Sequence, residues 1–362
     1  MKNLRRYFTL FLFILVFHSC VQHQLQHHQT ARAIWPVEKA NDWYAKWGWL
    51  RGSDFIPSTA INQLEMWQAD TFDPATIDKE LGWAAGIGMN SMRVYLHHLA
   101  WQQDKEGFKK RVSNYLDMAE KHKISTMFVF FDDCWNPTYK AGKQPEPTPG
   151  IHNSGWVRDP GDLLFSDSTL TDSLEIYVKD ILNTFKDDKR IVLWDLYNEP
   201  GNSGYGNKSM PLLEKVFEWA RTVNPSQPLS VGVWNLSLKE LTDYQIKNSD
   251  ITTYHNYGDL KDHQKWIDTL RSVSERPLIC TEYMARSRNS LFSNIMPLLK
   301  RENIGAYNWG LVAGKTNTIY AWDMPIKDGK EPKLWFHDIF YKDGRPYKQA
   351  EVDSIKLLTG KK

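Results

Sequence analysis

The sequence predicts an α/β fold, a single (β/α)8 TIM barrel with long loops after strands 3 and 8. From Trp49 onward, short apolar runs alternate with segments of helical periodicity, the pattern of βα units around a parallel sheet. Most runs are continuously apolar, as strands buried on both faces require. The length of 362 residues suits one such barrel, because barrels take ~250 residues or more as one unit.

Eight apolar runs qualify as strands, the number that a closed barrel needs. The fourth is the clearest, because I-V-L-W-D-L-Y-N runs apolar from Ile191 into a side-chain amide, a carboxylic acid and a proline. The predicted strands are 49–55, 91–97, 126–132, 192–198, 229–234, 251–256, 278–283 and 306–311.

Helices are predicted between these strands from apolar stripes and from start signals. The first begins at an Asp73 N-cap with Pro74 in its first turn and ends at Gly86 or Gly88. The apolar stripe of this helix is Ile77, Leu81 and Ala84. Three further helices have the stripes Phe108, Val112, Leu116 and Ala119; Leu174, Tyr177, Ile181 and Phe185; and Leu213, Phe217 and Ala220. Shorter signals mark helices at 238–246, 262–273, 289–300 and 352–358.

Two long insertions interrupt the alternation. The segment 133–170 is far longer than an ordinary βα loop and is rich in Pro and Gly, and 312–335 is a second long loop after the eighth strand. We expect the first to cover one side of the site. No linker divides the chain, so 35–362 is predicted to be one catalytic barrel.

The N-terminus is predicted to be an export signal. Basic residues precede a mostly apolar stretch that is too short to span a bilayer, and Ser19 and Cys20 follow it. Cys20 resembles the lipidation site of a bacterial lipoprotein; the alternative is an ordinary signal with a chance cysteine. We expect residues 1–20 to be the signal, 21–34 a flexible tether, and the protein to be periplasmic or anchored at the outer membrane or cell surface by lipid alone.

Composition excludes some partners and a disulfide framework. The 45 basic and 43 acidic residues nearly cancel, and no Lys/Arg cluster would follow a phosphate backbone, so nucleic acid is excluded as a partner. A monomer is expected. After Cys20 only Cys134 and Cys280 remain, and they are predicted to be two separate buried thiols on opposite sides of the barrel.

The C-terminal ends of the strands supply the candidate functional residues, because active sites of such barrels form there. Two glutamates stand out: Glu199 ends the fourth strand within N-E-P, and Glu282 ends the seventh. One carboxyl can protonate the oxygen of a glycosidic bond while the other attacks the sugar carbon. The other predicted strand-end residues are Arg93, His97, His98, Asp132, Asp133, Trp135, Asn198, Trp234, Asn235, His255, Tyr257, Asn308 and Trp309.

The motif N-E-P on strand four, with a second Glu on strand seven, resembles the clan A retaining glycoside hydrolases, similar to the family 5 cellulases and mannanases. The resemblance implies that Glu199 is the acid/base and that the amide of Asn198 binds the sugar 2-hydroxyl. It implies that Glu282 is the nucleophile, that Arg93 lies near Glu282, and that Tyr257, in His255-x-Tyr, supplies the phenol that orients Glu282. Trp309 would be the aromatic platform under the sugar. Trp135 and His97 complete the predicted substrate-binding set. The resemblance implies no cofactor and no metal, with a carbohydrate as substrate.

The chemistry makes demands on the two glutamates. The acid should have a raised pKa and the nucleophile should stay ionised, which a nearby guanidinium favours. Carboxyl groups ~5–5.5 Å apart would give retention of configuration, which we expect, whereas ~6.5–9.5 Å would give inversion. For Arg93 the alternative is a core ion pair with Asp132 or Glu282.

Two other functions stay open on sequence alone. Glu199, Glu282, Asp132 and His255 could hold a divalent ion in a barrel isomerase or hydrolase, or the barrel could be a sugar-binding lipoprotein without catalysis. Within the favoured function, a covered site predicts short or chain-end substrates.

Overall fold

The computed structural model describes residues 31–362. The predicted signal, the Cys20 lipidation site and most of the predicted tether therefore lie outside the described residues. Within the described part, no helix has both the length and the apolar character that crossing a bilayer requires.

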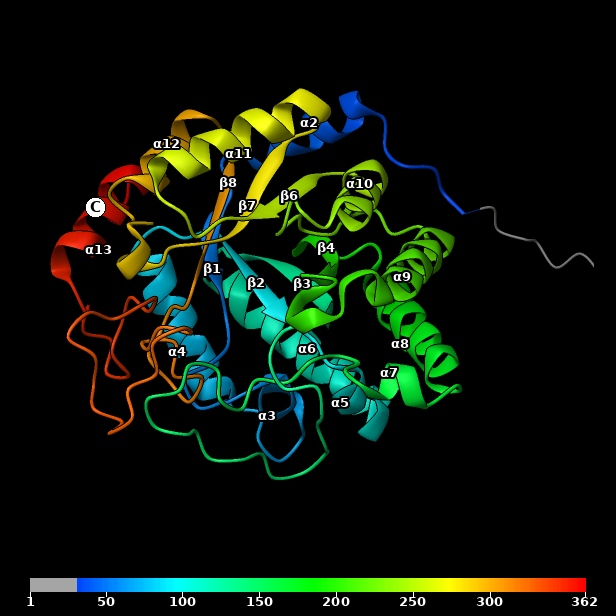
Figure 1. The fold of residues 1–362 in the computed structure, drawn as a ribbon, viewed down its shortest axis with the longest axis horizontal. Helices are drawn as coiled ribbons and strands as arrows, with labels where there is room; N and C mark the ends of the chain where they lie inside the picture. The colour runs from blue at the N-terminus through cyan, green and yellow to red at the C-terminus, as the bar shows by residue number, and fades with distance from the viewer. Residues whose placement is uncertain (1–30) are drawn as a thin grey trace, which may run out of the picture.

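The strands form one parallel eight-stranded sheet in the order β5-β4-β3-β2-β1-β8-β7-β6. A parallel bridge between Val233, which follows β5, and Tyr254 of β6 links the two ends of the sheet into a nearly closed barrel, so the predicted fold class is confirmed. Helices surround the strands (Figure 1). The strands are β1 (Arg51–Asp54), β2 (Ser91–Tyr95), β3 (Ser125–Asp132), β4 (Ile191–Asn198), β5 (Leu229–Ser230), β6 (Thr252–His255), β7 (Leu278–Tyr283) and β8 (Gly305–Trp309).

The helices follow the predicted stripes. Asp73 caps α4 by accepting a hydrogen bond from the backbone N–H of Thr76, with Pro74 in the first turn. The helices beside the strands are α4 (Pro74–Gly86), α5 (His98–Gln103), α6 (Lys105–Lys121), α8 (Leu170–Phe185), α9 (Met210–Val223), α10 (Lys239–Asn248), α11 (Leu260–Val273), α12 (Ile295–Arg301) and α13 (Gln349–Thr359). Short α3 (Gln63–Trp67), α7 (Leu163–Ser166) and the 3-10 turns η1 (Asn202–Gly204), η2 (Gly206–Ser209) and η3 (Arg286–Arg288) lie in loops.

Some predicted boundaries were wrong. The helix predicted from 289 begins at Ile295, because Asn289 adopts a left-handed conformation (φ +58°) that ends η3. The fifth strand ends at Ser230 rather than at Trp234, and the chain then continues as a loop. Both differences come from local backbone geometry that an apolar pattern does not encode.

Helix α2 (Val37–Trp47) precedes the barrel and was not predicted. Its Ala40 and Tyr44 pack in one buried cluster with Met127, Ile279 and Tyr307, which come from strands around the barrel. The helix therefore buries apolar side chains of the barrel interior, away from the C-terminal strand ends.

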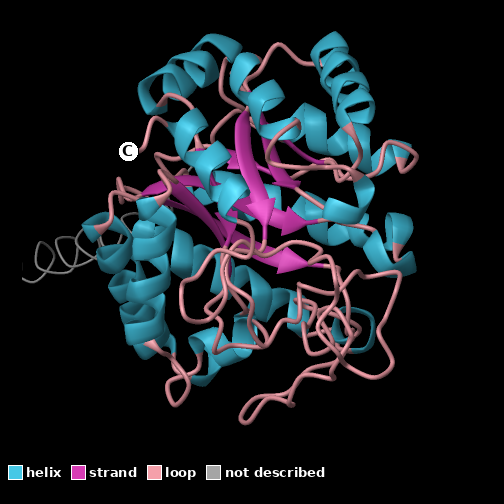
Figure 2. Ribbon diagram, turned by 90° about the vertical axis from the view of Figure 1, so that its left-hand side faces the viewer, coloured by secondary structure: helices cyan, strands magenta, loops and turns pink. Residues whose placement is uncertain are grey.

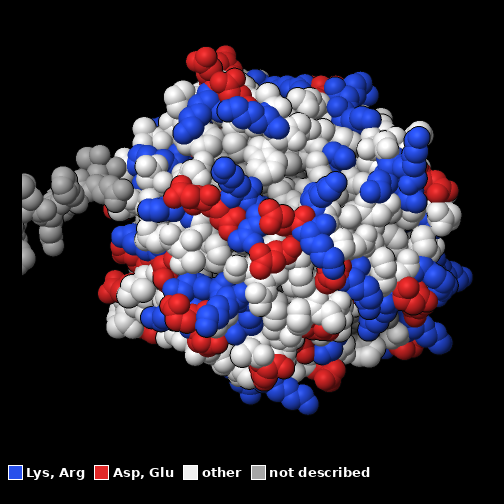
Figure 3. All heavy atoms as spheres, turned by 180° about the vertical axis from the view of Figure 1, so that it is seen from behind, with Lys and Arg blue, Asp and Glu red and all other residues white. Residues whose placement is uncertain are grey.

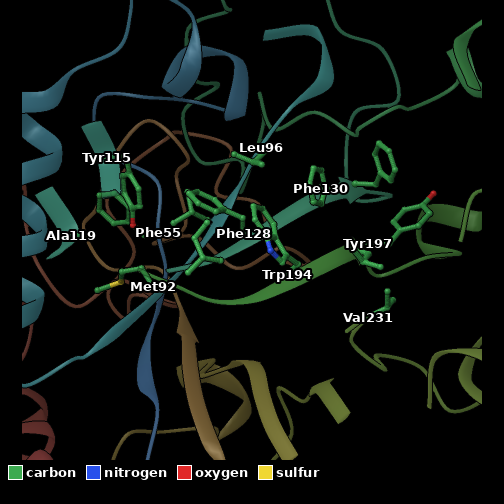
Figure 4. Packing of buried hydrophobic residues seen from close by; sticks show 14 of the residues in the cluster. Phe55, Met92, Leu96, Tyr115, Ala119, Phe128, Phe130, Trp194, Tyr197 and Val231 are labelled. Atoms are coloured by element: carbon green, nitrogen blue, oxygen red, sulfur yellow. The ribbon is translucent and has the colours of Figure 1, made fainter. Parts of the chain in front are cut away.

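The main core lies between the strands and the surrounding helices (Figure 4). Trp194 of β4 stacks against Phe128 and Phe130 of β3, with ring centroids 5.8 and 5.4 Å apart. Tyr115 of α6 contacts Phe128 from the helix side. Each such ring contributes roughly 1.5–3 kcal/mol by leaving water, so this layer keeps the strand ends in fixed positions.

The two long loops lie together at the end of the barrel toward which the strands point (Figure 2). The backbone N–H of Asn153 donates to the carbonyl of Thr316 (2.8 Å), and that of Ile326 donates to the carbonyl of Gly150 (3.0 Å). The expectation that segment 133–170 covers one side of the site is thus met with the help of the second loop.

The charged surface agrees with the near-neutral composition. Basic and acidic side chains alternate on the face shown in Figure 3, without a field of one sign. This distribution is unlike the basic stripe that binding to nucleic acid requires.

Candidate active site

A cavity of ≈ 720 Å³ lies at the C-terminal ends of the strands. Glu199 lines it immediately after β4, and its backbone adopts the left-handed region (φ +46°), which costs a non-glycine residue roughly 1–2 kcal/mol. Residues after five different strands contribute side chains, as in other barrel active sites. The lining includes Cys134, Trp135, Glu199, Trp234, His255, Tyr257 and Trp309.

Glu282 is held by three donors. Arg93 Nη1 donates to its Oε1 at 2.8 Å, the Tyr95 hydroxyl donates to the same oxygen at 3.0 Å, and the Tyr257 hydroxyl donates to Oε2 at 2.7 Å. The side chain is 4 % exposed. A carboxylate with a guanidinium and two phenols around it is stabilised in its charged form, which is the state a nucleophile needs.

Arg93 is fully buried at the centre of this network. Its guanidinium pairs with Asp54 (2.7 Å), Asp195 (2.8 Å) and Glu282 (2.8 Å). Arg93 therefore lies beside Glu282, as the resemblance implies, and also forms the buried ion pair with Glu282 that was the alternative. Asp132 is not among the salt-bridge partners of Arg93. Burial raises the pKa of Asp54 and of Asp195, although Arg93 opposes both shifts.

The same arginine positions Asn198. Arg93 Nη2 donates to Asn198 Oδ1 (2.7 Å), and Asn198 Nδ2 donates to Asp132 Oδ1 (2.9 Å). Because the amide oxygen is fixed by Arg93, the orientation of the amide is determined. Burial raises the pKa of Asp132 to about 7, against the hydrogen bonds from Trp156 and Asn198.

Glu199 has surroundings different from those predicted. Burial acts to raise its pKa, but the hydrogen bond and charge of His255 and the donors Cys134 and Asn202 lower the pKa below its usual value. His255 Nδ1 lies 2.7 Å from Oε1, and Cys134 Sγ and Asn202 Nδ2 donate to Oε2. The expectation of a raised pKa was wrong, because sequence cannot show that three donors converge on this carboxyl.

The two glutamates face each other. One carboxyl oxygen of Glu199, one of Glu282 and a ring nitrogen of His255 all lie within 4.8 Å of one another. His255 Nδ1 is 3.5 Å from Glu282 Oε1 as well as 2.7 Å from Glu199 Oε1. Neighbouring strands bring them together, since His255 of β6 is in register with Glu282 of β7.

Aromatic side chains form the walls of the cavity. Trp309 ends β8 and is 9 % exposed, and Trp135 lies beside His152 with ring centroids 5.2 Å apart. Trp322, from the loop after β8, contacts the ring of Tyr257 at 5.0 Å. Flat apolar faces of this kind suit sugar rings.

His97 is not brought to this site. It is fully buried, its Nδ1 accepts a hydrogen bond from the backbone N–H of Leu99 at the start of α5, and its ring contacts Tyr139. Its prediction as a substrate-binding residue is therefore corrected. The strand ends at Tyr95, two residues earlier than predicted, so His97 serves as a helix cap instead.

Several contacting residues were missed by the sequence reasoning. Tyr95 lies two residues after Arg93 on β2, so strand periodicity places both side chains on one face, and this signal could have found it. Cys134 was predicted to be a buried thiol, but it is partly exposed and lines the cavity. Cys134 and Cys280 are separate and free, as predicted.

Two clusters have the donor atoms that a metal ion needs. The first is Glu199, His255 and Glu282; the second is His97, His98 and Asp159, which is buried beside the barrel. In the second cluster Asp159 already accepts from the backbone N–H and the ring of His98. In each cluster a histidine ring and a carboxyl group already form a hydrogen bond with each other.

Comparison with known proteins bears on the family. Residues 165–311, which include Glu199 and Glu282, match the family model described as glycosyl hydrolases family 2, TIM barrel domain. The match spans less than half of the chain and ends just after the eighth strand. This match agrees with the resemblance inferred from N-E-P and with the predicted class of enzyme, a glycoside hydrolase. No curated protein matches the chain.

Solved structures share the fold at low identity. The GH5_18 protein of Streptomyces cattleya, in complex with GlcNAc, has a TM-score of 0.58 and 10 % identity over 86 % of this chain and 80 % of its own. An endo-1,4-beta-mannanase of Rhizomucor miehei has a TM-score of 0.55 and 13 % identity, over 87 % of this chain and 96 % of its own. An exo-beta-1,4-mannosidase of Opitutaceae bacterium strain TAV5 has a TM-score of 0.59 and 16 % identity, over 86 % of this chain and 59 % of its own.

Proposed function

We propose that the protein is a retaining glycoside hydrolase that cleaves β-linked oligo- or polysaccharides by double displacement, with Glu199 as acid/base and Glu282 as nucleophile. One observation carries the proposal: the carboxyl oxygens of these residues approach within 4.8 Å. This approach is compatible with the ~5–5.5 Å between the carboxyl groups of retaining enzymes and is shorter than the ~6.5–9.5 Å of inverting enzymes.

In the first step, a Glu282 oxygen attacks the anomeric carbon while the bond to the leaving oxygen breaks. Glu199 transfers its proton to that oxygen, so the leaving sugar departs as a neutral alcohol and a glycosyl ester remains on Glu282. In the second step, Glu199 takes a proton from water, the resulting hydroxyl attacks the anomeric carbon, and Glu282 leaves as carboxylate. The two inversions restore the original configuration.

The lowered pKa of Glu199 is compatible with this role. His255 Nδ1 and Glu199 Oε1 are hydrogen-bonded at 2.7 Å, so a proton can be shared between the ring and the carboxyl. One proton held by the pair is enough for the first step, since it can pass along that hydrogen bond to the carboxyl. Arg93 and the two phenols stabilise the carboxylate of Glu282, so the proton is kept on the Glu199 side.

The substrate class is proposed from the cavity and the fold. Trp309, Trp135 and Trp322 offer flat faces to sugar rings. Proteins of similar fold are described as beta-mannanases and as an exo-beta-1,4-mannosidase. β-Mannosides therefore belong first in a substrate panel, followed by β-glucosides.

The test replaces each carboxyl in turn. In Glu282→Gln we expect kcat to fall by at least about 10⁴-fold because no glycosyl ester can form. In Glu199→Gln we expect a fall of about 10²–10⁴-fold with alkyl leaving groups, and a smaller fall with dinitrophenyl glycosides, which need no proton. Glu214→Gln, on the exposed face of α9, is the matched control and should keep full activity.

A mass measurement completes the test. A 2-fluoro glycoside should add one sugar mass to the peptide that contains Glu282 in the wild type and none in Glu282→Gln. Hydrolysis with inverted product configuration, or label on another residue, would contradict the assignment.

A metal-dependent barrel hydrolase is the second candidate, because one donor atom each of Glu199, His255 and Glu282 lies within 4.8 Å of the other two. The electrostatics disfavour it, since Arg93 already lies 2.8 Å from Glu282 Oε1 and would repel a divalent cation. We expect activity to survive dialysis against EDTA unchanged. Loss with EDTA and recovery with one divalent ion would favour the metal enzyme.

We also propose that the enzyme is exported and anchored through lipid on Cys20. The proposal rests on the basic, apolar and Ser-Cys order of the first 20 residues.

A further inference from the structure

We infer that the cavity accepts a single sugar ring on the non-reducing side of the cleaved bond, so that the enzyme removes terminal residues from chain ends. This inference rests on the proposed function and extends it to the mode of action. It depends on which side of the cavity is closed and on what closes it.

The acid/base marks the side of the leaving group, because its proton goes to the oxygen that departs. Beside Glu199 the cavity is lined by Asn202 and Ser203 of η1 and by Trp234, and further round the barrel end by Asp262 and Trp266 of α11. Ser203 is exposed and the other four are only partly buried. On this side a leaving chain can extend toward solvent.

The opposite side ends in a wall of packed aromatic rings. Trp156 meets Trp309 edge to face with centroids 5.5 Å apart, and Tyr95 meets Trp156 at 5.1 Å and Trp309 at 5.8 Å. Trp156 is only 2 % exposed. Tyr95 also donates to Glu282, so this wall stands directly beside the predicted nucleophile.

Behind the wall there is no room for a second ring. A small void lined by Asp54, Tyr95, Trp156 and Trp309 measures only ≈ 20 Å³. A single water molecule needs roughly 10–15 Å³ of such space, so the void holds about one water. A chain that continued in this direction would have to displace the tryptophans.

The roof above the wall is fastened on both sides. His152 Nδ1 is hydrogen-bonded to the Tyr320 carbonyl (2.8 Å), and Asn317 Nδ2 donates to the Thr148 carbonyl (2.9 Å). Lys315 pairs with Glu65 of α3 at 2.6 Å. With the two backbone bonds already described, these contacts join the loops after β3 and β8 over the barrel end (Figure 2). An internal cut in a long chain requires a groove open at both ends, whereas here the aromatic wall and the joined loops occupy the side away from the leaving group.

The experiment follows the products of a defined oligosaccharide. β-1,4-Linked mannohexaose and cellohexaose, labelled at the reducing end, are incubated with the full barrel and sampled at early times. We expect the labelled chain to shorten one ring at a time, with free monosaccharide as the sole unlabelled product. Labelled fragments of two or three rings in the first samples would overturn the inference.

A blocked substrate gives a second measurement that needs no variant. Methylation of the non-reducing terminal ring at O4 adds volume where the wall stands, so we expect hydrolysis to stop. Continued internal cleavage of the blocked chain would contradict a closed end. Failure of the proposed function is seen separately, as absence of 2-fluoro glycoside label on Glu282 with every sugar tested, and it would remove this inference as well.

A pair of variants tests the wall itself. Trp156→Ala removes the ring, whereas the control Trp156→Phe keeps a ring and loses only the hydrogen bond from Nε1 to Asp132 (2.7 Å). We expect the ratio of internal to terminal cuts to rise by at least about tenfold in the alanine variant and to stay unchanged in the phenylalanine variant. The same ratio in both variants, measured on folded protein, would refute the role of Trp156.

Discussion

At the scale of single residues, the two glutamates differ in the hydrogen-bond donors that surround their carboxyl groups. Glu282 is bonded to Arg93, Tyr95 and Tyr257, whereas Glu199 is bonded to His255, Cys134 and Asn202. Only the first set contains a permanent cation. The proton therefore belongs to the Glu199 side of the cavity, and its release is sensitive to the neighbours of that carboxyl.

Cys134→Ala should change the pH profile. Burial acts to raise the pKa of Glu199; His255 lowers this pKa most, and the hydrogen bond donated by the Cys134 thiol lowers it further. Removal of the thiol raises the pKa of Glu199, so the acid form persists to higher pH. We expect the alkaline limb of kcat/KM to move to higher pH.

The matched control is Cys280→Ala, because the thiol of Cys280 donates to the backbone carbonyl of Glu282 and not to a catalytic carboxyl. Its alkaline limb should coincide with that of the wild type. A limb that moves to lower pH in Cys134→Ala, or equal movement in both variants, would count against a role for the thiol.

At the scale of elements, strand β1 depends on a glycine at its contact with β2. A Cβ on Gly52 would lie 1.6 Å from the carbonyl oxygen of Ser91, its partner in register. The two backbones cannot move apart without breaking the barrel. We expect Gly52→Ala to lower the free energy of unfolding by about 3 kcal/mol or more, measured by urea denaturation.

Gly86→Ala is the control for that substitution. Gly86 ends α4, and an added Cβ there meets no atom within 4 Å. We expect a neutral result or a gain of roughly 0.5–1 kcal/mol from helix propensity. Equal effects at both glycines would show that the close approach of β1 and β2 is unimportant.

Helix α4 carries a buried carboxyl that should make stability depend on pH. Burial raises the pKa of Glu80 to about 7 from 4.5, although the Ser58 N–H opposes this shift. Because the pKa of Glu80 is higher in the folded state, its protonation stabilises the fold. This stabilisation is complete below pH 4.5 and is lost as the pH rises through 7. The shift from 4.5 to about 7 corresponds, at about 1.36 kcal/mol per pKa unit, to a total loss of slightly more than 3 kcal/mol.

The measurement compares urea unfolding at pH 5 and pH 8. Glu80→Gln should show a smaller fall in stability between these values than the wild type, since its amide cannot ionise. Glu120→Gln, exposed on α6, should behave like the wild type. A fall of equal size in Glu80→Gln would exclude this carboxyl as the cause.

At the scale of the whole molecule, one barrel positions every residue of the site. The helices bury the outer side of the strands, α2 covers apolar residues of the barrel interior, and the two joined loops restrict the cavity at the other end. The proposed N-terminal anchor would tether this barrel without a membrane-spanning helix.

Cys20→Ala tests that anchor. If Cys20 is acylated, the wild type should incorporate labelled palmitate and sediment with membranes, whereas the variant should do neither. Glycosidase activity should be equal in both, because the barrel is unchanged. Membrane association of the unlabelled variant would contradict lipid anchoring through this residue.

The strand order, the two glutamates and the helix stripes could be predicted because they depend on local periodicity. Glu199 and Glu282 each end an apolar run, and Asp73-Pro74 begins a helix by capping chemistry. Tyr95 was within reach of the same argument. Cys134, Trp322 and α2 were not, since their roles depend on contacts between segments distant in the chain.

The sequence by itself determined that eight strands bring two carboxyl groups to one end of a barrel, because side-chain periodicity and chain direction settle which strand ends meet. Only the tertiary structure decided which donors surround each carboxyl, that His97 caps a helix instead of lining the cavity, and that Trp156 packs against Trp309. Those facts arise from packing between long loops, whose paths are set by many weak contacts rather than by a local pattern.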